Sequence, residues 1–66
     1  MANTKNLTVE GRKLRCLGYY CYNGHYNTTV FEVLPDNQTA YLGEIADCQT
    51  DDSDFRSRIV KFLKTR

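Results

Sequence analysis

The spacing of the apolar residues changes once along this chain, near residue 50. Before that point, three segments are dense in the β-branched and aromatic residues that favour strands. These segments cover residues 14–22, 25–34 and 39–46. After it, an amphipathic-helix stripe with i, i+4, i+7, i+8 spacing is formed by Phe55, Ile59, Phe62 and Leu63. The pattern predicts three strands followed by one helix over residues 51–64.

Charged residues favour the same helix. Acidic residues gather at its start and basic residues at its end, which complements the helix dipole. Thr50 or the residue after it is expected to cap the first turn. Asp52 with Arg56, and Asp54 with Arg58, have the spacing of favourable ion pairs on a helix surface.

Two turn signals separate the three expected strands. Asn23-Gly24 is a strong hairpin signal because both residues tolerate the positive φ of a type I′ turn. The second turn lies in residues 35–38. A two-residue loop at Asn23-Gly24 pairs Cys16 with Phe31, and the second turn then pairs Phe31 with Leu42. The fold class predicted is α+β: a three-stranded antiparallel meander with one C-terminal helix packed on one face.

Sixty-six residues make one small domain, 1–66. Chains of this size bury only about 60% of their unfolded surface, which leaves little room for a catalytic cleft. Residues 1–11 are polar and show little periodicity, so we expect them to form a loose N-terminal arm.

Strand alternation divides the sheet into two faces. The face expected to meet the helix carries Leu14, Cys16, Phe31, Val33, Ala40 and Leu42. The other face carries Arg15, Leu17, Tyr19, Cys21, Tyr26, Val30, Glu32, Tyr41 and Ile45. On this second face Arg15 and Glu32 are expected to form a cross-strand ion pair.

The second face is the expected binding surface, because contiguous exposed apolar and tyrosine side chains mark interaction sites. Three occupants are open: a partner protein, a second copy of this chain, or the N-terminal arm through Leu7 and Val9. Seven acidic residues and no Lys or Arg lie between Cys16 and Asp54, so the hairpin edges are expected to attract a basic partner. The expected partner-binding residues are Leu17, Tyr19, Tyr26, Val30, Glu32, Tyr41 and Glu44.

Metal binding and catalysis are not expected. Cys16, Cys21, His25 and Cys48 make a formal zinc-ligand set, but alternation places Cys16 and Cys21 on opposite faces. The aspartates at 47, 51, 52 and 54 lack the glycine and terminal glutamate of a calcium loop. Cys21 and His25 are also predicted on opposite faces, with no oxyanion hole. We therefore expect no cofactor and no enzyme activity.

The string Gly18-Tyr19-Tyr20-Cys21-Tyr22, followed by a strand ending in Tyr41-Leu42-Gly43 and a helix, resembles the arm-site DNA-binding domain of lambda-type phage integrases. The resemblance implies a three-stranded sheet inserted in the DNA major groove. Such sheets present Arg and Lys to the phosphates, whereas the second and third expected strands here carry Glu32 and Glu44 and no cation. Nucleic-acid contact is instead assigned to the arm and helix residues Arg12, Lys13, Arg58, Lys61 and Lys64.

The leading expectation is thus a non-enzymatic protein-binding module of the inhibitor or adaptor type, of a kind that phages and other mobile elements often encode. The alternative is a nucleic-acid-binding accessory domain. The net charge of +1 gives no global attraction to polyanions or membranes. With an odd number of cysteines, no export signal and no apolar run of membrane-spanning length, a cytoplasmic location is expected.

Overall fold

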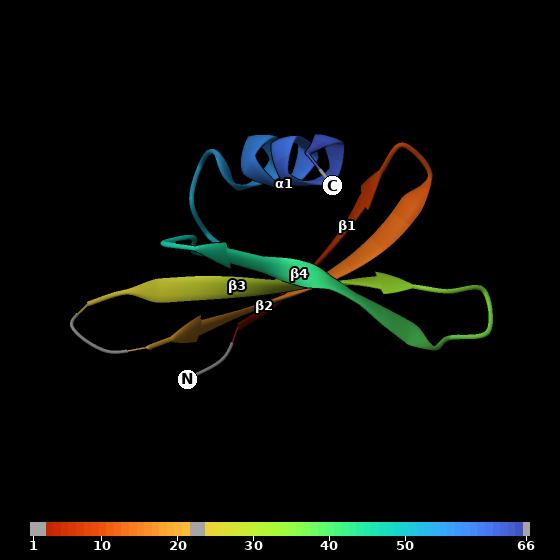
Figure 1. Ribbon diagram of the computed structural model, residues 1–66, viewed down its shortest axis with the longest axis horizontal. Helices are drawn as coiled ribbons and strands as arrows, with labels where there is room; N and C mark the ends of the chain where they lie inside the picture. Colours follow the sequence, from red (N-terminus) through yellow and green to blue (C-terminus); the bar gives the residue numbers. More distant parts are fainter. Residues whose placement is uncertain (1–2, 22–23, 66) are drawn as a thin grey trace.

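A computed structural model describes residues 3–21 and 24–65 of the chain. The strands are β1 (Asn3–Val9), β2 (Arg12–Tyr20), β3 (Tyr26–Val33) and β4 (Thr39–Ala46), followed by the helix α1 (Phe55–Lys64). The strands form one antiparallel sheet in the order β1-β2-β3-β4, and α1 crosses one face of it (Figure 1). The predicted α+β class is confirmed, but the prediction of three strands is wrong.

The additional strand, β1, lies in the segment that was expected to be a loose arm. It pairs with β2 through a tight turn at Glu10 and Gly11, both of which have positive φ, 52° and 80°. This is the type I′ pattern that usually takes Asn or Gly at its first position, so Glu10 conceals it in the sequence. Leu7 lies opposite Leu14, and Val9 is buried, so the apolar residues of β1 join the side of the sheet that α1 covers.

The pairing of β2 with β3 differs by one residue from the prediction. Cys16 lies opposite Val30 rather than Phe31. The Cys21 amide donates to the His25 carbonyl at 2.8 Å, which closes the hairpin one residue further from its tip than a two-residue loop would. Gly24, at φ 79°, supplies the left-handed residue typical of a three-residue loop. The predicted turn residue Asn23 lies outside the described residues.

The second hairpin shows the same one-residue difference. The Leu34 amide donates to the Gln38 carbonyl at 2.7 Å, and Asn37 adopts φ 66°. Phe31 is therefore paired with Tyr41 instead of Leu42. Further along, the register shifts between Val30 and Phe31, so β4 carries one additional residue in this ladder.

A one-residue change of register moves every side chain of a strand to the other face. Val30 has no solvent exposure and belongs to the core, although the sequence predicted it on the uncovered face. Phe31 and Val33 point away from the core instead, because alternation along β3 places them on the face opposite to the buried Thr28 and Val30. Leu14 and Cys16 are buried as predicted.

The core lies between the sheet and α1 (Figure 1). Its buried apolar members come from β1, β2, β3, the β4–α1 loop and the helix: Val9, Leu14, Cys16, Val30, Cys48, Phe55 and Ile59. Phe55 and Ile59 confirm the predicted helix stripe. Burying one such side chain contributes about 1.5–3 kcal/mol, so this small cluster accounts for much of what holds the helix to the sheet.

The helix begins at Phe55, four residues later than predicted, because the preceding loop packs onto the sheet. Thr50 is buried in this loop, with its methyl group against Gly18 of β2. A Cβ atom added at Gly18 would lie 2.9 Å from the Thr50 methyl carbon, so only glycine fits at that position. Thr50 is therefore not the helix cap. Asp54 occupies that position without a side-chain capping hydrogen bond.

The two predicted helix-surface ion pairs are also replaced. Arg58 donates to the carbonyls of Asp47 and Ala46, at 2.7 and 3.3 Å, and lies 3.9 Å from Asp52. Arg56 donates to the Thr8 carbonyl at 3.1 Å. These two arginines therefore tie α1 to both edge strands of the sheet.

The strained turn at Glu10 predicts a stabilising substitution. Glu10→Asn places a residue that tolerates positive φ in the type I′ turn, and we expect about 1 kcal/mol of added stability. For a domain of this size that corresponds to a rise in Tm of about 4–8 °C. Thermal unfolding followed by circular dichroism measures the shift.

Glu10→Gln is the matched control, since it removes the charge and keeps the unfavourable backbone conformation. The same rise in Tm for both variants would show that charge, rather than backbone strain, limits this turn.

Candidate functional site

The side of the sheet that faces away from α1 is called the open face. In Figure 1 the helix lies on the opposite side, and none of the described elements packs on the open face. Its apolar and aromatic side chains are Leu17, Tyr19, Phe31, Val33 and Tyr41, and its charged ones are Lys13, Arg15 and Glu44. The open face therefore combines large apolar groups with both signs of charge.

Two aromatic rings lie in contact on the open face. Phe31 and Tyr41 lie opposite each other on β3 and β4, with ring centroids 5.8 Å apart and planes at 66°. The Tyr41 residue is 64% exposed, the highest value among the exposed large hydrophobic residues. An edge-to-face pair holds both rings in a fixed orientation, so they present a rigid surface.

A polar contact fixes the other end of this face. The hydroxyl of Tyr19 on β2 donates a hydrogen bond across β3 to the carboxylate of Glu44 on β4. Residue 44 reaches the open face because the extra residue in β4 reverses its alternation after Tyr41. The carboxylate of Glu44 is thereby held beside the aromatic groups.

The structure brings together four of the seven residues predicted to bind a partner: Leu17, Tyr19, Tyr41 and Glu44. It does not place the other three with them. Val30 is in the core, and Glu32 lies opposite Leu14 on the side of the helix. Tyr26 lies on that side too, paired with Tyr20 at the end of the hairpin with ring centroids 5.1 Å apart.

Sequence reasoning did not select Phe31 and Val33, which it assigned to the core. The signal for their true position is the length of the two loops. A third loop residue with positive φ, at Gly24 and at Asn37, places both side chains on the open face.

Glu32 forms an ion pair with Arg12, not with Arg15. The Arg12 guanidinium donates to the Glu32 carboxylate at 2.7 Å on the side of the sheet that carries α1. This hydrogen bond lowers the pKa of Glu32 below its ordinary value and raises the pKa of Arg12. The predicted Arg15–Glu32 pair does not form because alternation sends the two side chains to opposite faces.

The side chains of Arg15 and Lys13 make no hydrogen bond or ion pair with any residue that the structure describes. They line a hollow of about 260 Å³ together with residues from β1, β2 and β3. The open-face members of that lining are Asn6, Thr8, Lys13, Arg15 and Val33. Two side chains with unpaired positive charge therefore border a small depression on the open face.

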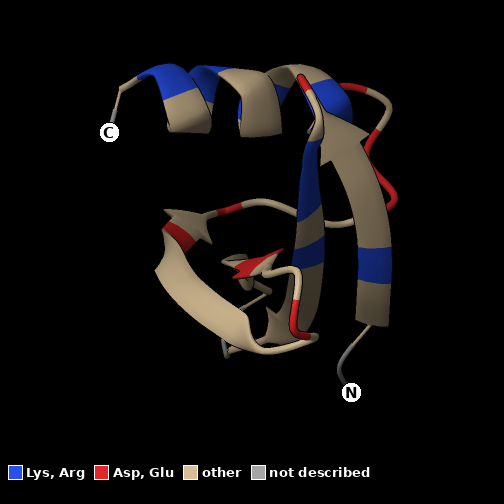
Figure 2. Ribbon diagram, turned by 90° about the vertical axis from the view of Figure 1, so that its right-hand side faces the viewer, with Lys and Arg blue, Asp and Glu red and all other residues tan. Residues whose placement is uncertain are grey.

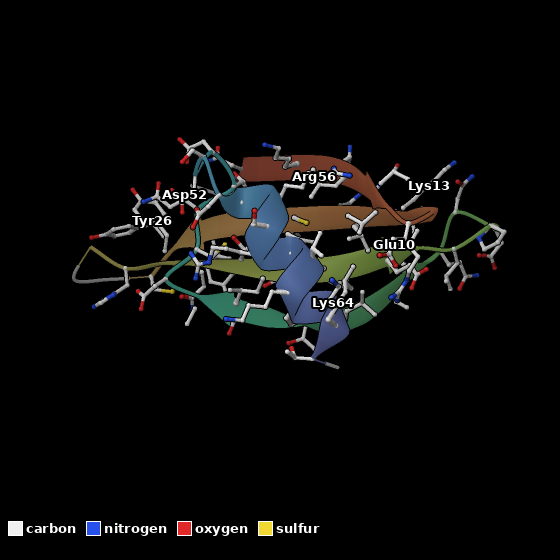
Figure 3. All side chains as sticks on the ribbon, turned by 90° about the horizontal axis from the view of Figure 1, so that it is seen from above. Glu10, Lys13, Tyr26, Asp52, Arg56 and Lys64 are labelled. Carbon is white, nitrogen blue, oxygen red and sulfur yellow. The ribbon has the colours of Figure 1, made fainter. Side chains whose placement is uncertain are left out.

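The residues predicted to contact nucleic acid are divided by the structure. Arg12 and Arg58 are engaged by Glu32 and by backbone carbonyls. Lys61 and Lys64 line a shallow hollow of about 520 Å³ along α1, together with Arg56, Ser57 and Val60. Figure 2 shows basic residues along the α1 ribbon, and Figure 3 labels Arg56 and Lys64 among them. Lys13 belongs to the open face.

Cys16 and Cys48 lie near each other, but Cys21 and His25 do not join them in one metal-binding group. Cys16 and Cys48 are buried, and burial, with Cys48 nearby, raises the pKa of Cys16 to about 11. His25 instead lies 2.8 Å from Asp47 through its Nδ1 atom, at the surface. Within residues 3–21 and 24–65, no group of three or more His, Cys, Asp or Glu side chains is arranged to hold a metal ion.

The Arg12–Glu32 pair predicts how stability changes with pH. Because the folded pKa of Glu32 is lowered, the pair's contribution to the free energy of unfolding is present above the ordinary carboxyl pKa of about 4.3. It is lost as the pH falls through the folded value. Glu32→Gln should therefore be less stable than the parent protein at pH 7, and the difference should shrink towards pH 3 in urea unfolding curves.

Arg12→Gln should also be less stable than the parent protein at pH 7, with a difference that shrinks towards pH 3. Arg15→Gln should keep the parent protein's dependence of stability on pH. The reverse result for the two arginines would show that Glu32 pairs across the open face.

No helix within the described part of the chain is both long and apolar enough to span a bilayer. In comparisons with known proteins, no family model, no curated protein and no solved structure matches this chain.

Proposed function

We propose that this protein is a non-enzymatic binding module that docks its open face onto a partner protein. The observation that carries the proposal is the rigid aromatic pair Phe31–Tyr41 on a sheet face that none of the described elements covers. Large aromatic groups with a polar tip supply contact area at low entropic cost and are enriched at protein interfaces.

The surrounding residues support the same use of this face. Leu17 and Val33 add aliphatic surface on either side of the Phe31 row, and both are partly exposed. Aromatic anchors bordered by less critical contacts are typical of the centre of a protein–protein interface. The Tyr19–Glu44 hydrogen bond adds a fixed polar group at the edge.

The N-terminal segment is not a competitor for this face. It forms the edge strand β1, and its apolar residues Leu7 and Val9 pack with the core on the side of the helix. Two occupants of the open face therefore remain, a partner protein and a second copy of this chain. The experiment below distinguishes between them.

An adaptor or inhibitor is the role that we assign to such a module, in the cytoplasm of a cell that carries a phage or another mobile element. Three free cysteines fit a reducing compartment.

A second candidate function, nucleic-acid binding, is favoured by the basic side of α1. Arg56, Lys61 and Lys64 line its hollow without an acidic residue among the lining. A duplex that contacts this side would bind with an affinity that falls steeply with salt. Titration of a short duplex at low and high salt separates this candidate from the first, since no binding at low salt would exclude it.

Tyr41→Ala tests the main proposal. Tyr41 is largely exposed, so the variant should keep the fold. Its affinity for the partner should fall at least tenfold, which corresponds to a loss of about 1.4 kcal/mol of binding free energy. Affinity capture from host lysate with the parent protein and the variant as baits, followed by quantitative mass spectrometry, measures this loss. Sedimentation of the purified protein shows whether a second copy is the partner.

Tyr20→Ala is the matched control. Tyr20 is 46% exposed but lies on the other side of the sheet, so this variant should retain the partner. Equal retention by both variants would refute docking through the open face.

A further inference from the structure

We propose that the open face binds an acidic, partly apolar segment of its partner, with a carboxylate of that segment placed between Lys13 and Arg15. This inference rests on the proposed function and names the chemistry of the partner. It reverses the charge preference expected from the sequence, which was for a basic partner.

The first observation is that these two cations differ from the other basic residues of the sheet. Arg12 is held by Glu32, and Lys5 donates to the Thr50 carbonyl at 3.3 Å and lies 5.4 Å from the centre of the Phe55 ring. Lys13 and Arg15 have no such partner among the described residues. Their positive charge is therefore available to a ligand.

The second observation is the hollow of about 260 Å³ that these residues border. Asn6 and Thr8 on β1 line it from the other strand and contribute an amide and a hydroxyl. An arginine guanidinium beside a lysine ammonium matches the oxygens of a carboxylate, and the neighbouring polar groups can complete its hydrogen bonds.

The third observation is that the aromatic pair lies next to the residues that line the hollow. Asn6, Arg15, Phe31 and Tyr41 are successive partners in one row across the four strands, and Val33 lines the hollow itself. A segment with an acidic residue near an apolar one would place its carboxylate at Arg15 and its apolar side chain against Phe31 and Tyr41.

Charge on the rest of the face favours a peptide over a nucleic-acid strand. A strand needs a series of cations that follows its phosphates, and its affinity grows with their number. The open face has two cations at one end and the carboxylate of Glu44 held by Tyr19 at the other. Leu17 and Val33 are aliphatic and suit protein side chains better than stacked bases.

The second carboxylate of β3 and β4, Glu32, does not weaken this charge preference. It points to the side of the helix and is already neutralised by Arg12 at 2.7 Å. The acidic character that the sequence assigned to this part of the sheet is therefore mostly absent from the open face.

The test uses the intact protein with three labelled probes in fluorescence anisotropy: a short Glu/Leu peptide, its Gln/Leu counterpart and a short oligothymidylate. The Glu/Leu peptide should bind more tightly than the other two. The double variant Lys13→Gln, Arg15→Gln should weaken its binding about tenfold, as expected for the loss of two exposed ion pairs. The variant Lys61→Gln, Lys64→Gln on α1 carries the same charge change and should bind as the parent does.

Three results would overturn the inference: no binding of the Glu/Leu peptide, tighter binding of the oligothymidylate, or equal weakening by the α1 control. Capture of the native partner separates this inference from the proposed function. If Tyr41→Ala loses the partner and the Lys13/Arg15 variant retains it, the face is the docking site and the acidic chemistry is wrong. If both variants retain the partner, both proposals fail.

Discussion

The register of β2 against β3 is the constraint on which the rest of the structure depends. The hydrogen bond from the Cys21 amide to the His25 carbonyl closes their hairpin, and alternation then decides which side chain of each pair meets the helix. With this register, Val30 completes the core beneath Phe55 and Ile59, and Phe31 is left on the open face. A closure one residue nearer the tip would exchange these two residues, which would bury an aromatic ring and expose a valine.

The basic residues of α1 fall into two groups. Arg56 and Arg58 point towards the sheet and donate to backbone carbonyls of β1, of the end of β4 and of the loop after it, so they fix α1 over the core. Lys61 and Lys64 are exposed to solvent. The loop before the helix is fixed by Thr28, whose hydroxyl donates to the Cys48 carbonyl at 2.8 Å, and by Thr50 against Gly18. All of these contacts are on the helix side of the sheet or at its edges, so none of the described elements covers the open face.

The helix was predictable because Phe55 and Ile59 recur at helical spacing. The strand β3 was predictable because β-branched residues are dense in it. The loop lengths were not, since Asn23-Gly24 is compatible with two- and three-residue loops and the choice depends on packing across the whole sheet. The edge strand β1 was missed because Glu10 adopts a positive φ that its residue type disfavours. For the site, Leu17, Tyr19 and Tyr41 could be predicted because the alternation of β2 and of the first half of β4 is as expected. Phe31 could not, because it follows the register of β3.

The most direct test of this account is a NOESY spectrum of the isotope-labelled protein in solution. The register of β2 against β3 predicts cross-peaks between the methyl groups of Val30 and the side chains of the core helix residues Phe55 and Ile59. It also predicts cross-peaks between the rings of Phe31 and Tyr41, and none between Phe31 and Ile59. Cross-peaks from Phe31 to Ile59, with Val30 lacking contacts to the helix, would contradict the register and with it the assignment of the open face.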